Sequence, residues 1–171
     1  SRHSNKNIEN HWVSITFDDG PNSKFTPRVL DLLAKYNAKA TFFCVGKTIE
    51  QNPKILKQII DEGHSIGNHT YTHSNNFGFF PLDKILNELK QTENLVHSLT
   101  GKRMKLYRPA FGVTNPQIAK ATHQLQLHSI GWNVRSLDTT FRSEKEVLKR
   151  ITGKVSKGDI ILLHDTSEKT I

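Results

Sequence analysis

Short apolar runs alternate along the chain with longer segments in which apolar residues recur every three or four positions. The short runs are typical of buried strands, and the longer segments are typical of helices with one apolar face. Proline follows Thr26, Asn52 and Asn115, where it favours the first turn of a helix. The predicted strands are 12–17, 40–45, 64–68, 106–107, 127–134 and 159–163, and the predicted helices begin near residues 26, 52, 81, 115 and 143.

Strand and helix follow one another roughly six times in this pattern. Such alternation predicts an α/β fold, with a parallel sheet or barrel inside and helices outside. We find no internal repeat and no linker-like segment. We therefore expect one catalytic domain over residues 12–171, preceded by an N-terminal lead-in at residues 1–11.

Composition and charge narrow the choice of partner. The chain is 35% hydrophobic, and no run approaches the ~18 apolar residues of a membrane span, so we expect no transmembrane segment. The net charge of +8 favours an anionic partner, but the lysines and arginines are scattered and lack interleaved aromatic residues. We therefore expect no nucleic-acid partner. Cys44 is the only cysteine, which excludes an internal disulfide.

Polar residues with possible chemistry follow several of the apolar runs. Asp18 and Asp19 end the first run, and His69, Arg108 and His164 each follow a later one. Because the carboxyl ends of parallel strands meet at one rim, we expect these side chains to lie close together. Two adjacent carboxylates repel each other, which a bound metal relieves, although an ordinary Asp-Gly turn explains the same pair.

His69 and His73 are four residues apart. On a helical turn this spacing puts both rings on one face, as metal ligands require, whereas on a loop they are simply polar residues. With one carboxylate from another strand end they make a three-ligand site with an open position for water, which is a catalytic arrangement. Nitrogen and oxygen ligands together favour zinc, with cobalt or nickel as alternatives, over calcium or magnesium.

These motifs together resemble the polysaccharide deacetylases of the NodB-homology type, which form carbohydrate esterase family 4. The likeness extends over roughly residues 12–166 and includes the connecting stretches 40–43 and 63–69. It implies a distorted (β/α) barrel of about seven strands. Five motifs match in order: Thr16–Gly20, His69–His73, Arg108–Gly112, Trp132–Thr139 and Leu162–Asp165.

The resemblance also implies roles for the rim residues. Asp19, His69 and His73 hold the metal by the family's pattern. Asp18 is the general base that deprotonates the metal-bound water, and His164 is the acid that protonates the leaving amine. Each role matches the chemistry available to its side chain.

Four further positions belong to the implied site. Arg108 orients Asp18, and the backbone N–H of Phe111 binds the oxyanion. Trp132 and Leu162 form the wall of the pocket for the acetyl methyl group. The aromatic stretch 75–80, with Phe77, either stacks on a sugar ring or packs beneath its own loop.

The fourth motif departs from the family, which typically has Asp-x-x-Asp-Trp where this chain has residues 135–139. Arg135 replaces the first Asp, the usual partner of the catalytic histidine, so we expect Arg135 to lower the pKa of His164. Asp138, which we place on the substrate side, is an alternative partner, and Arg135 can also point elsewhere. The chain ends seven residues after His164, so we expect either missing C-terminal residues or a different barrel closure.

We therefore predict a metal-dependent hydrolase that removes N-acetyl groups from an amino-sugar polymer. Peptidoglycan, chitin-like oligomers and exopolysaccharide all fit, and the basic charge slightly favours an anionic wall polymer. One alternative is an O-acetyl esterase of the same fold, acting on a xylan-type polymer. Another is a catalytically weakened glycan-binding module. By resemblance we expect a monomer that acts outside the cytoplasm.

Overall fold

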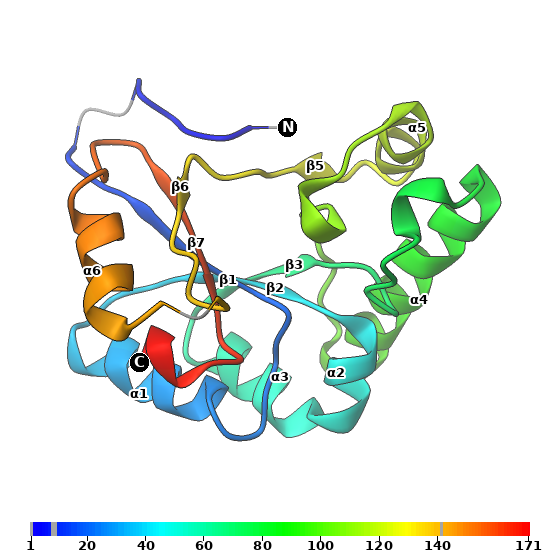
Figure 1. Ribbon diagram of the computed structural model, residues 1–171. Helices are drawn as coiled ribbons and strands as arrows, with labels where there is room; N and C mark the ends of the chain where they lie inside the picture. Colours follow the sequence, from blue (N-terminus) through cyan, green and yellow to red (C-terminus); the bar gives the residue numbers. More distant parts are fainter. Residues whose placement is uncertain (1, 8–9, 141) are drawn as a thin grey trace.

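The centre of the fold is one curled sheet of seven parallel strands, ordered β5-β4-β3-β2-β1-β7-β6. The computed structural model describes residues 2–7, 10–140 and 142–171. The expectation of a distorted barrel is confirmed, because the curled sheet makes half of a barrel (Figure 1). The strands are β1 Ser14–Asp18, β2 Thr41–Cys44, β3 Ser65–Asn68, β4 Leu106–Tyr107, β5 His128–Ser129, β6 Val134–Arg135 and β7 Ile160–His164.

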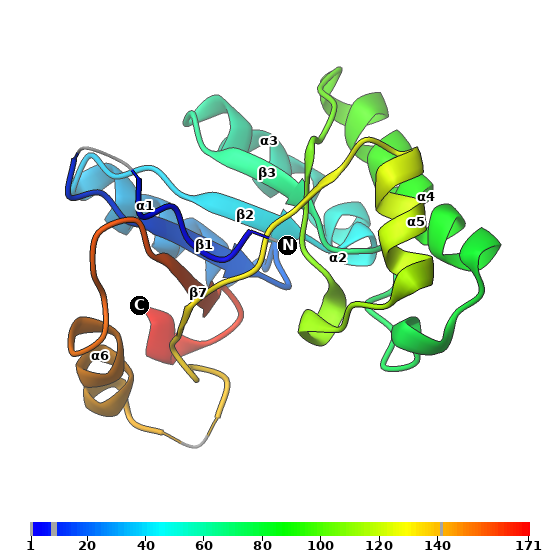
Figure 2. The ribbon, with the colours of Figure 1, turned by 90° about the horizontal axis from the view of Figure 1, so that it is seen from above.

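Helices cover the outside of this sheet. In Figure 1, α1, α2 and α3 lie below it, α4 and α5 lie beyond its β5 edge, and α6 lies on the β7 side; Figure 2 shows the same grouping from above. Among the described helices, none is both long enough and apolar enough to cross a membrane. The bounds are α1 Thr26–Lys35, α2 Gly46–Gln51, α3 Pro53–Asp61, α4 Leu82–Thr100, α5 Pro116–Gln124 and α6 Glu144–Thr152, with 3₁₀ turns η1 Phe77–Phe79, η2 Ala110–Gly112 and η3 Glu168–Thr170.

Local sequence signals set several helix ends. The Asn115 side chain caps α5 by accepting from the Ile118 N–H at 2.8 Å. Ser143 and Glu146 form the capping box predicted for α6. Each satisfies N–H groups that the first helical turn leaves without a partner.

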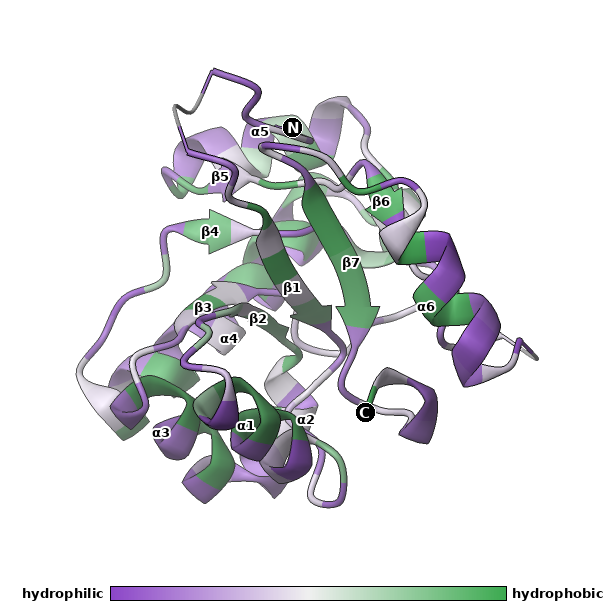
Figure 3. Cartoon of the chain, turned by 90° about the vertical axis from the view of Figure 1, so that its left-hand side faces the viewer, coloured by the Kyte–Doolittle hydropathy of each residue, from purple (hydrophilic) through white to green (hydrophobic). Residues whose placement is uncertain are grey.

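The core consists of two hydrophobic clusters. The larger joins β1 and β2 to α1, α2 and α3, and Phe17 stacks on Phe42 within it at 5.1 Å between ring centroids. The smaller joins α4, α5, β4 and η1, and it contains Phe77, which is 1% exposed. Strand β7 is hydrophobic along most of its length (Figure 3), as expected for a strand with neighbours on both sides.

The prediction of one strand over 127–134 is wrong. The segment contains β5 and the first residue of β6, two-residue strands that lie at opposite edges of the sheet. Residues 130–133 between them pass across the open side of the half-barrel. Apolar content marks the whole segment as buried, but it does not show that the chain leaves one sheet edge and joins the other.

The N-terminal residues lie along this crossing segment. The Arg2 N–H donates to the Ser129 carbonyl at 2.9 Å, and the Gly131 N–H donates to the Arg2 carbonyl at 2.7 Å. The Asn5 N–H donates to Gly158 at 2.8 Å, on the β7 side. Residues 2–5 therefore connect the end of β5 to the segment that leads into β7.

Candidate active site

At the end of β1, the neighbouring residues Asp18 and Asp19 direct their carboxylates to different partners. Asp18 is 3% exposed and closes the strand, with the Cα atoms of Phe43 and His164 as its neighbours in register. Asp19 has φ +74°, a left-handed conformation that Asp tolerates better than most residues. The backbone therefore turns between them, and each carboxylate meets different partners.

Gly20 allows this turn to lie close to the last strand. A Cβ atom at Gly20 would lie 2.2 Å from an Asp165 carboxylate oxygen, so no larger residue fits. Asp165 is fully buried and accepts from the Thr26 hydroxyl at 2.5 Å. Burial raises its pKa to about 7. Its position therefore sets how closely the β1 turn approaches β7.

His69 and His73 lie on a loop after β3 and not on a helical turn, and both rings still belong to one group with Asp19. Thr70 and His73 have φ of +68° and +50°, which no helix continues. Buried Glu88 of α4 holds the loop instead, accepting from the N–H groups of Tyr71 at 3.0 Å and Thr72 at 2.8 Å. These side-chain acceptors replace the hydrogen bonds that a helical turn would have made.

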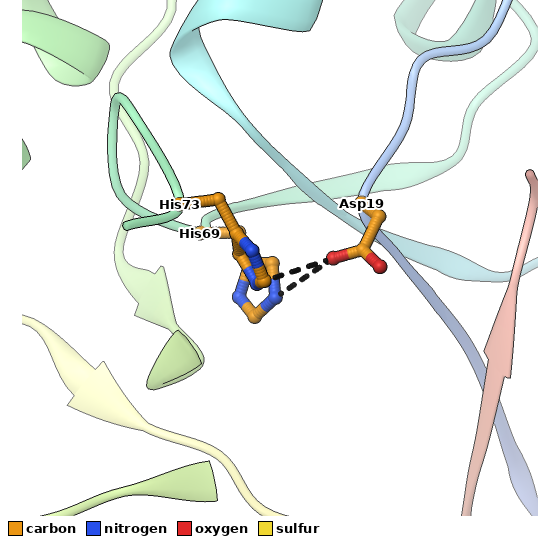
Figure 4. Close-up of side chains that lie close together, drawn as sticks. All are labelled: Asp19, His69 and His73. Atoms are coloured by element: carbon orange, nitrogen blue, oxygen red, sulfur yellow. Dashed lines mark ion pairs between the residues drawn. The ribbon is translucent and has the colours of Figure 1, made fainter. Parts of the chain in front are cut away.

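Asp19, His69 and His73 form a group with the geometry of a metal site (Figure 4). The Asp19 Oδ1 lies 3.4 Å from His69 Nε2 and 3.3 Å from His73 Nε2. The His69 Nδ1 lies 2.8 Å from the Arg108 carbonyl, so Nδ1 carries the proton and Nε2 presents its lone pair to the group. A histidine fixed in this tautomer is typical of metal ligands, and this donor set fits a divalent ion such as zinc.

Arg108 crosses the interior of the half-barrel. It is fully buried, and its Nη1 donates to Asp18 Oδ1 and to the Thr16 hydroxyl, both at 2.7 Å. Its Nε and Nη2 donate to the carbonyls of Ile130 and Gly131 at 3.2 and 2.9 Å. One side chain thus fixes the Asp18 carboxylate and ties the crossing segment to β1.

His164 lies on the other side of the group, with its Nε2 4.0 Å from Asp19 Oδ2. Its Nδ1 lies 2.8 Å from Asp138 Oδ1, and its N–H donates to Asp138 Oδ2 at 2.7 Å. Asp138 is fully buried and does not line the cavity, so its placement among substrate-side residues is wrong. The second Asp of the fourth motif is therefore the partner of the histidine.

The pKa of His164 shifts opposite to our expectation. Burial lowers it, but the hydrogen bond and charge of Asp138 outweigh burial and raise it. Arg135 is not among the groups that shift it, because this exposed side chain does not displace Asp138. Similarly, burial lowers the pKa of His69, but Asp18 and Asp19 raise it overall. The pKa of His73 is lowered instead, first by burial and then by the charge of His69, so the three histidines do not shift in one direction.

The group opens into a cavity of about 240 Å³. Phe111, Trp132 and Leu162 line it, as the resemblance implied. Phe111 has φ +56°, and its ring centroid is 4.5 Å from that of His73. Phe77 is buried in the core, so stacking on a sugar is wrong for this side chain. The lining also includes Arg135 and Thr139 of the fourth motif.

Sequence reasoning missed the residues that support this site. Glu88 was not predicted, although its position on the apolar face of α4, between Ile85 and Thr92, gave a signal. A carboxylate on a buried helical face needs hydrogen-bond donors from elsewhere. Asn68 was also missed: its side chain donates to the Leu89 carbonyl at 2.9 Å and accepts from the Thr70 N–H at 2.9 Å.

Comparisons with known proteins agree with this geometry. The family model described as polysaccharide deacetylase matches residues 5–130. A peptidoglycan-N-acetylglucosamine deacetylase of Bacillus cereus is 39% identical over 155 residues, covering 90% of this chain and 56% of the relative. The peptidoglycan-N-acetylmuramic acid deacetylase PdaA of Bacillus subtilis is 33% identical over 165 residues, covering 94% and 62%. The chain thus spans less than two thirds of these curated relatives.

The fold comparison gives the same result. The crystal structure of the Bc1960 peptidoglycan N-acetylglucosamine deacetylase matches with a TM-score of 0.90 and 37% identity. The match covers 98% of this chain and 77% of that one. Because almost the whole chain is covered, the likeness includes both sides of the cavity.

Proposed function

The chain belongs to the polysaccharide deacetylase family, and from this we propose that it is a metal-dependent hydrolase that removes N-acetyl groups from an amino-sugar polymer. The observation that carries the proposal is the placement of Asp18 and His164 in one cavity with the Asp19, His69 and His73 group. A proton acceptor and a proton donor beside a metal-binding group are the parts that amide hydrolysis needs.

Asp19, His69 and His73 would hold the ion, and we propose zinc, with cobalt or nickel as alternatives. When bound, a divalent ion there supplies Lewis acidity and lowers the pKa of a water molecule. Asp18 accepts the proton of the attacking water. The ion pair of Arg108 with Asp18 Oδ1 at 2.7 Å fixes the carboxylate and leaves Oδ2 to take the proton.

The remaining groups act on the other side of the acetyl carbon. The Phe111 N–H donates to the oxyanion that develops there, since Phe111 lines the cavity. His164, whose pKa Asp138 raises, gives its proton to the departing amine nitrogen. Trp132 and Leu162 exclude water from the acetyl methyl group. Arg108 thus positions Asp18, and Asp138 positions His164 and raises its pKa, at the two ends of the reaction.

We propose peptidoglycan, or a related amino-sugar polymer, as the substrate. The two curated relatives act, by their names, on N-acetylglucosamine and N-acetylmuramic acid in peptidoglycan. Such a substrate lies outside the cytoplasm, so we propose an extracytoplasmic location, at the cell surface, in the periplasm or secreted. We propose a monomer, because one chain supplies every residue of the site.

The test is acetate release from N-acetylglucosamine oligomers, peptidoglycan glycan strands and acetylated xylan. We expect release from an N-acetyl substrate, loss of that release with a chelator, and recovery with added zinc. Release from acetylated xylan alone would instead identify an O-acetyl esterase. Binding of metal without release from any substrate would support the glycan-binding alternative.

A further inference from the structure

Arg135 is the residue of the cavity that the mechanism does not use. It lies on β6, in register with Leu162 of β7, and both residues line the cavity. Its neighbour Val134 is 2% exposed, whereas Arg135 is exposed, because successive strand residues face opposite sides. Arg135 therefore belongs to the exposed wall of the cavity that Asp18, Asp19 and His164 also line.

The charge of Arg135 has no partner within the described part of the chain. None of its carboxylates lies within 4.0 Å of this guanidinium, and Arg135 is the only lysine or arginine in the lining. The other lining charges are engaged, since Asp18 pairs with Arg108 and Asp19 with the histidines. Arg150 adds to the positive charge, because its Nε donates to the Arg135 carbonyl at 2.8 Å.

The remaining walls of the cavity are poor partners for an anion. Phe111, Trp132 and Leu162 are apolar, and Thr139 carries no charge. A substrate carboxylate near the reacting acetamide therefore finds one strong recognition group. The planar guanidinium presents donors that match the two oxygens of a carboxylate.

We propose that Arg135 is a specificity-determining residue that binds a carboxylate carried by the acetylated sugar or by the adjoining sugar. The preferred substrate is then an anionic amino-sugar polymer. A neutral polymer presents nothing to this side chain. This inference rests on the proposed deacetylase function and narrows its substrate class.

The experiment uses glycan strands whose acetylated sugars carry a 3-O-lactyl carboxylate. Half of the preparation is converted to the methyl ester, so that the two substrates differ in charge and keep the same scaffold. Acetate release and equilibrium binding are measured for the wild type, Arg135→Gln and Arg135→Lys. Arg103→Gln is the matched control, because Arg103 is 66% exposed and lies before β4, at the opposite end of the strands.

We expect the wild type to prefer the free carboxylate by about tenfold in kcat/KM, mainly through a lower KM. A tenfold preference is the size expected for one charge-assisted hydrogen bond at an exposed site. Arg135→Gln should remove most of this preference, and Arg135→Lys should restore part of it. The preference should weaken as salt is added, whereas Arg103→Gln should retain it.

Equal rates and equal binding for the two substrates in the wild type would overturn the inference while leaving deacetylation intact. Equal losses on both substrates in Arg135→Gln would also overturn it, since they would indicate a general structural role. If the wild type releases no acetate at all, the proposed function fails. The binding measurement then decides the inference separately, because a carboxylate preference that depends on Arg135 would still be visible.

Discussion

The two walls of the active-site cavity differ in how they are built. At the end of β1 and directly after β3 and β4, Asp18, His69 and Arg108 are at most 3% exposed, and each bonds to another buried group. On β6 and the loop after it, Arg135 and Thr139 are exposed. Buried, fully bonded groups cannot change without cost to the fold, whereas exposed ones can. We infer that the first wall sets the chemistry and the second sets the choice of substrate.

Arg108→Gln should lower the free energy of unfolding more than any other substitution proposed here. It leaves Asp18 as an unpaired buried charge and removes hydrogen bonds to the crossing segment. Removal of one partner of a buried ion pair typically costs about 3–5 kcal/mol of unfolding free energy. Urea unfolding measures this loss. Arg103→Gln, whose surface contact with Glu93 is 3.7 Å long, should lose less than about 1 kcal/mol. Equal losses in the two variants would contradict the role of Arg108.

Glu88→Ala should make the loop of residues 69–73 less rigid, because Glu88 binds its main chain from α4. The N–H groups of Tyr71 and Thr72 lose their acceptor, and His73 loses its fixed position. We expect metal affinity to fall about 10- to 100-fold, as for other groups that orient ligands, in a competition assay with a chromophoric chelator. The control is Glu93→Ala on the same helix, which removes the acceptor of the Met104 N–H and the surface contact with Arg103. Unchanged metal affinity in Glu88→Ala would mean that the loop keeps its conformation without Glu88.

Asp138→Asn should alter the pH dependence rather than the fold of the metal group. Asp138 raises the pKa of His164, so the histidine remains protonated to higher pH. Without the carboxylate charge, the alkaline limb of the kcat profile should move to lower pH. Acetate release across pH, at saturating substrate, measures the shift. An unmoved limb would mean that His164 is not the acid.

Phe111→Ala should have the smallest effect. The substitution keeps the main-chain N–H that we assign to the oxyanion and removes the ring that lies against His73. We expect kcat to fall less than about threefold, compared with the 10²–10³-fold that loss of an oxyanion donor costs. Single-turnover rates would distinguish the two. A fall of a hundredfold would show that the ring itself is needed.

The sequence predicted the buried wall well. Asp18, His69, Arg108 and His164 each follow an apolar run, and in a parallel sheet such positions must meet at one edge. The structure brings all four together. The motif spacing also carried the resemblance, which the family comparison confirms.

The exposed wall was predicted poorly, for physical reasons. Strands β5 and β6 have two residues each, too few for a period to show, so one strand was predicted where the chain crosses between two edges. To predict the partner of His164, one must know whether residue 135 or residue 138 faces the histidine. The register of β6 against β7 decides this, and the sequence does not show that register. On the buried side, the contact of Glu88 of α4 with the loop of residues 69–73 was also missed, because sequence spacing does not show which helix packs on which loop.

The most direct test of the account compares the two neighbouring aspartates. Asp18→Asn and Asp19→Asn each remove one charge from adjacent positions, and both are measured for bound zinc and for acetate release. The account predicts that Asp18→Asn retains zinc and loses release at least about a thousandfold, whereas Asp19→Asn loses zinc as well. Equal loss of zinc in both variants, or substantial release by Asp18→Asn, would contradict the division between base and ligand.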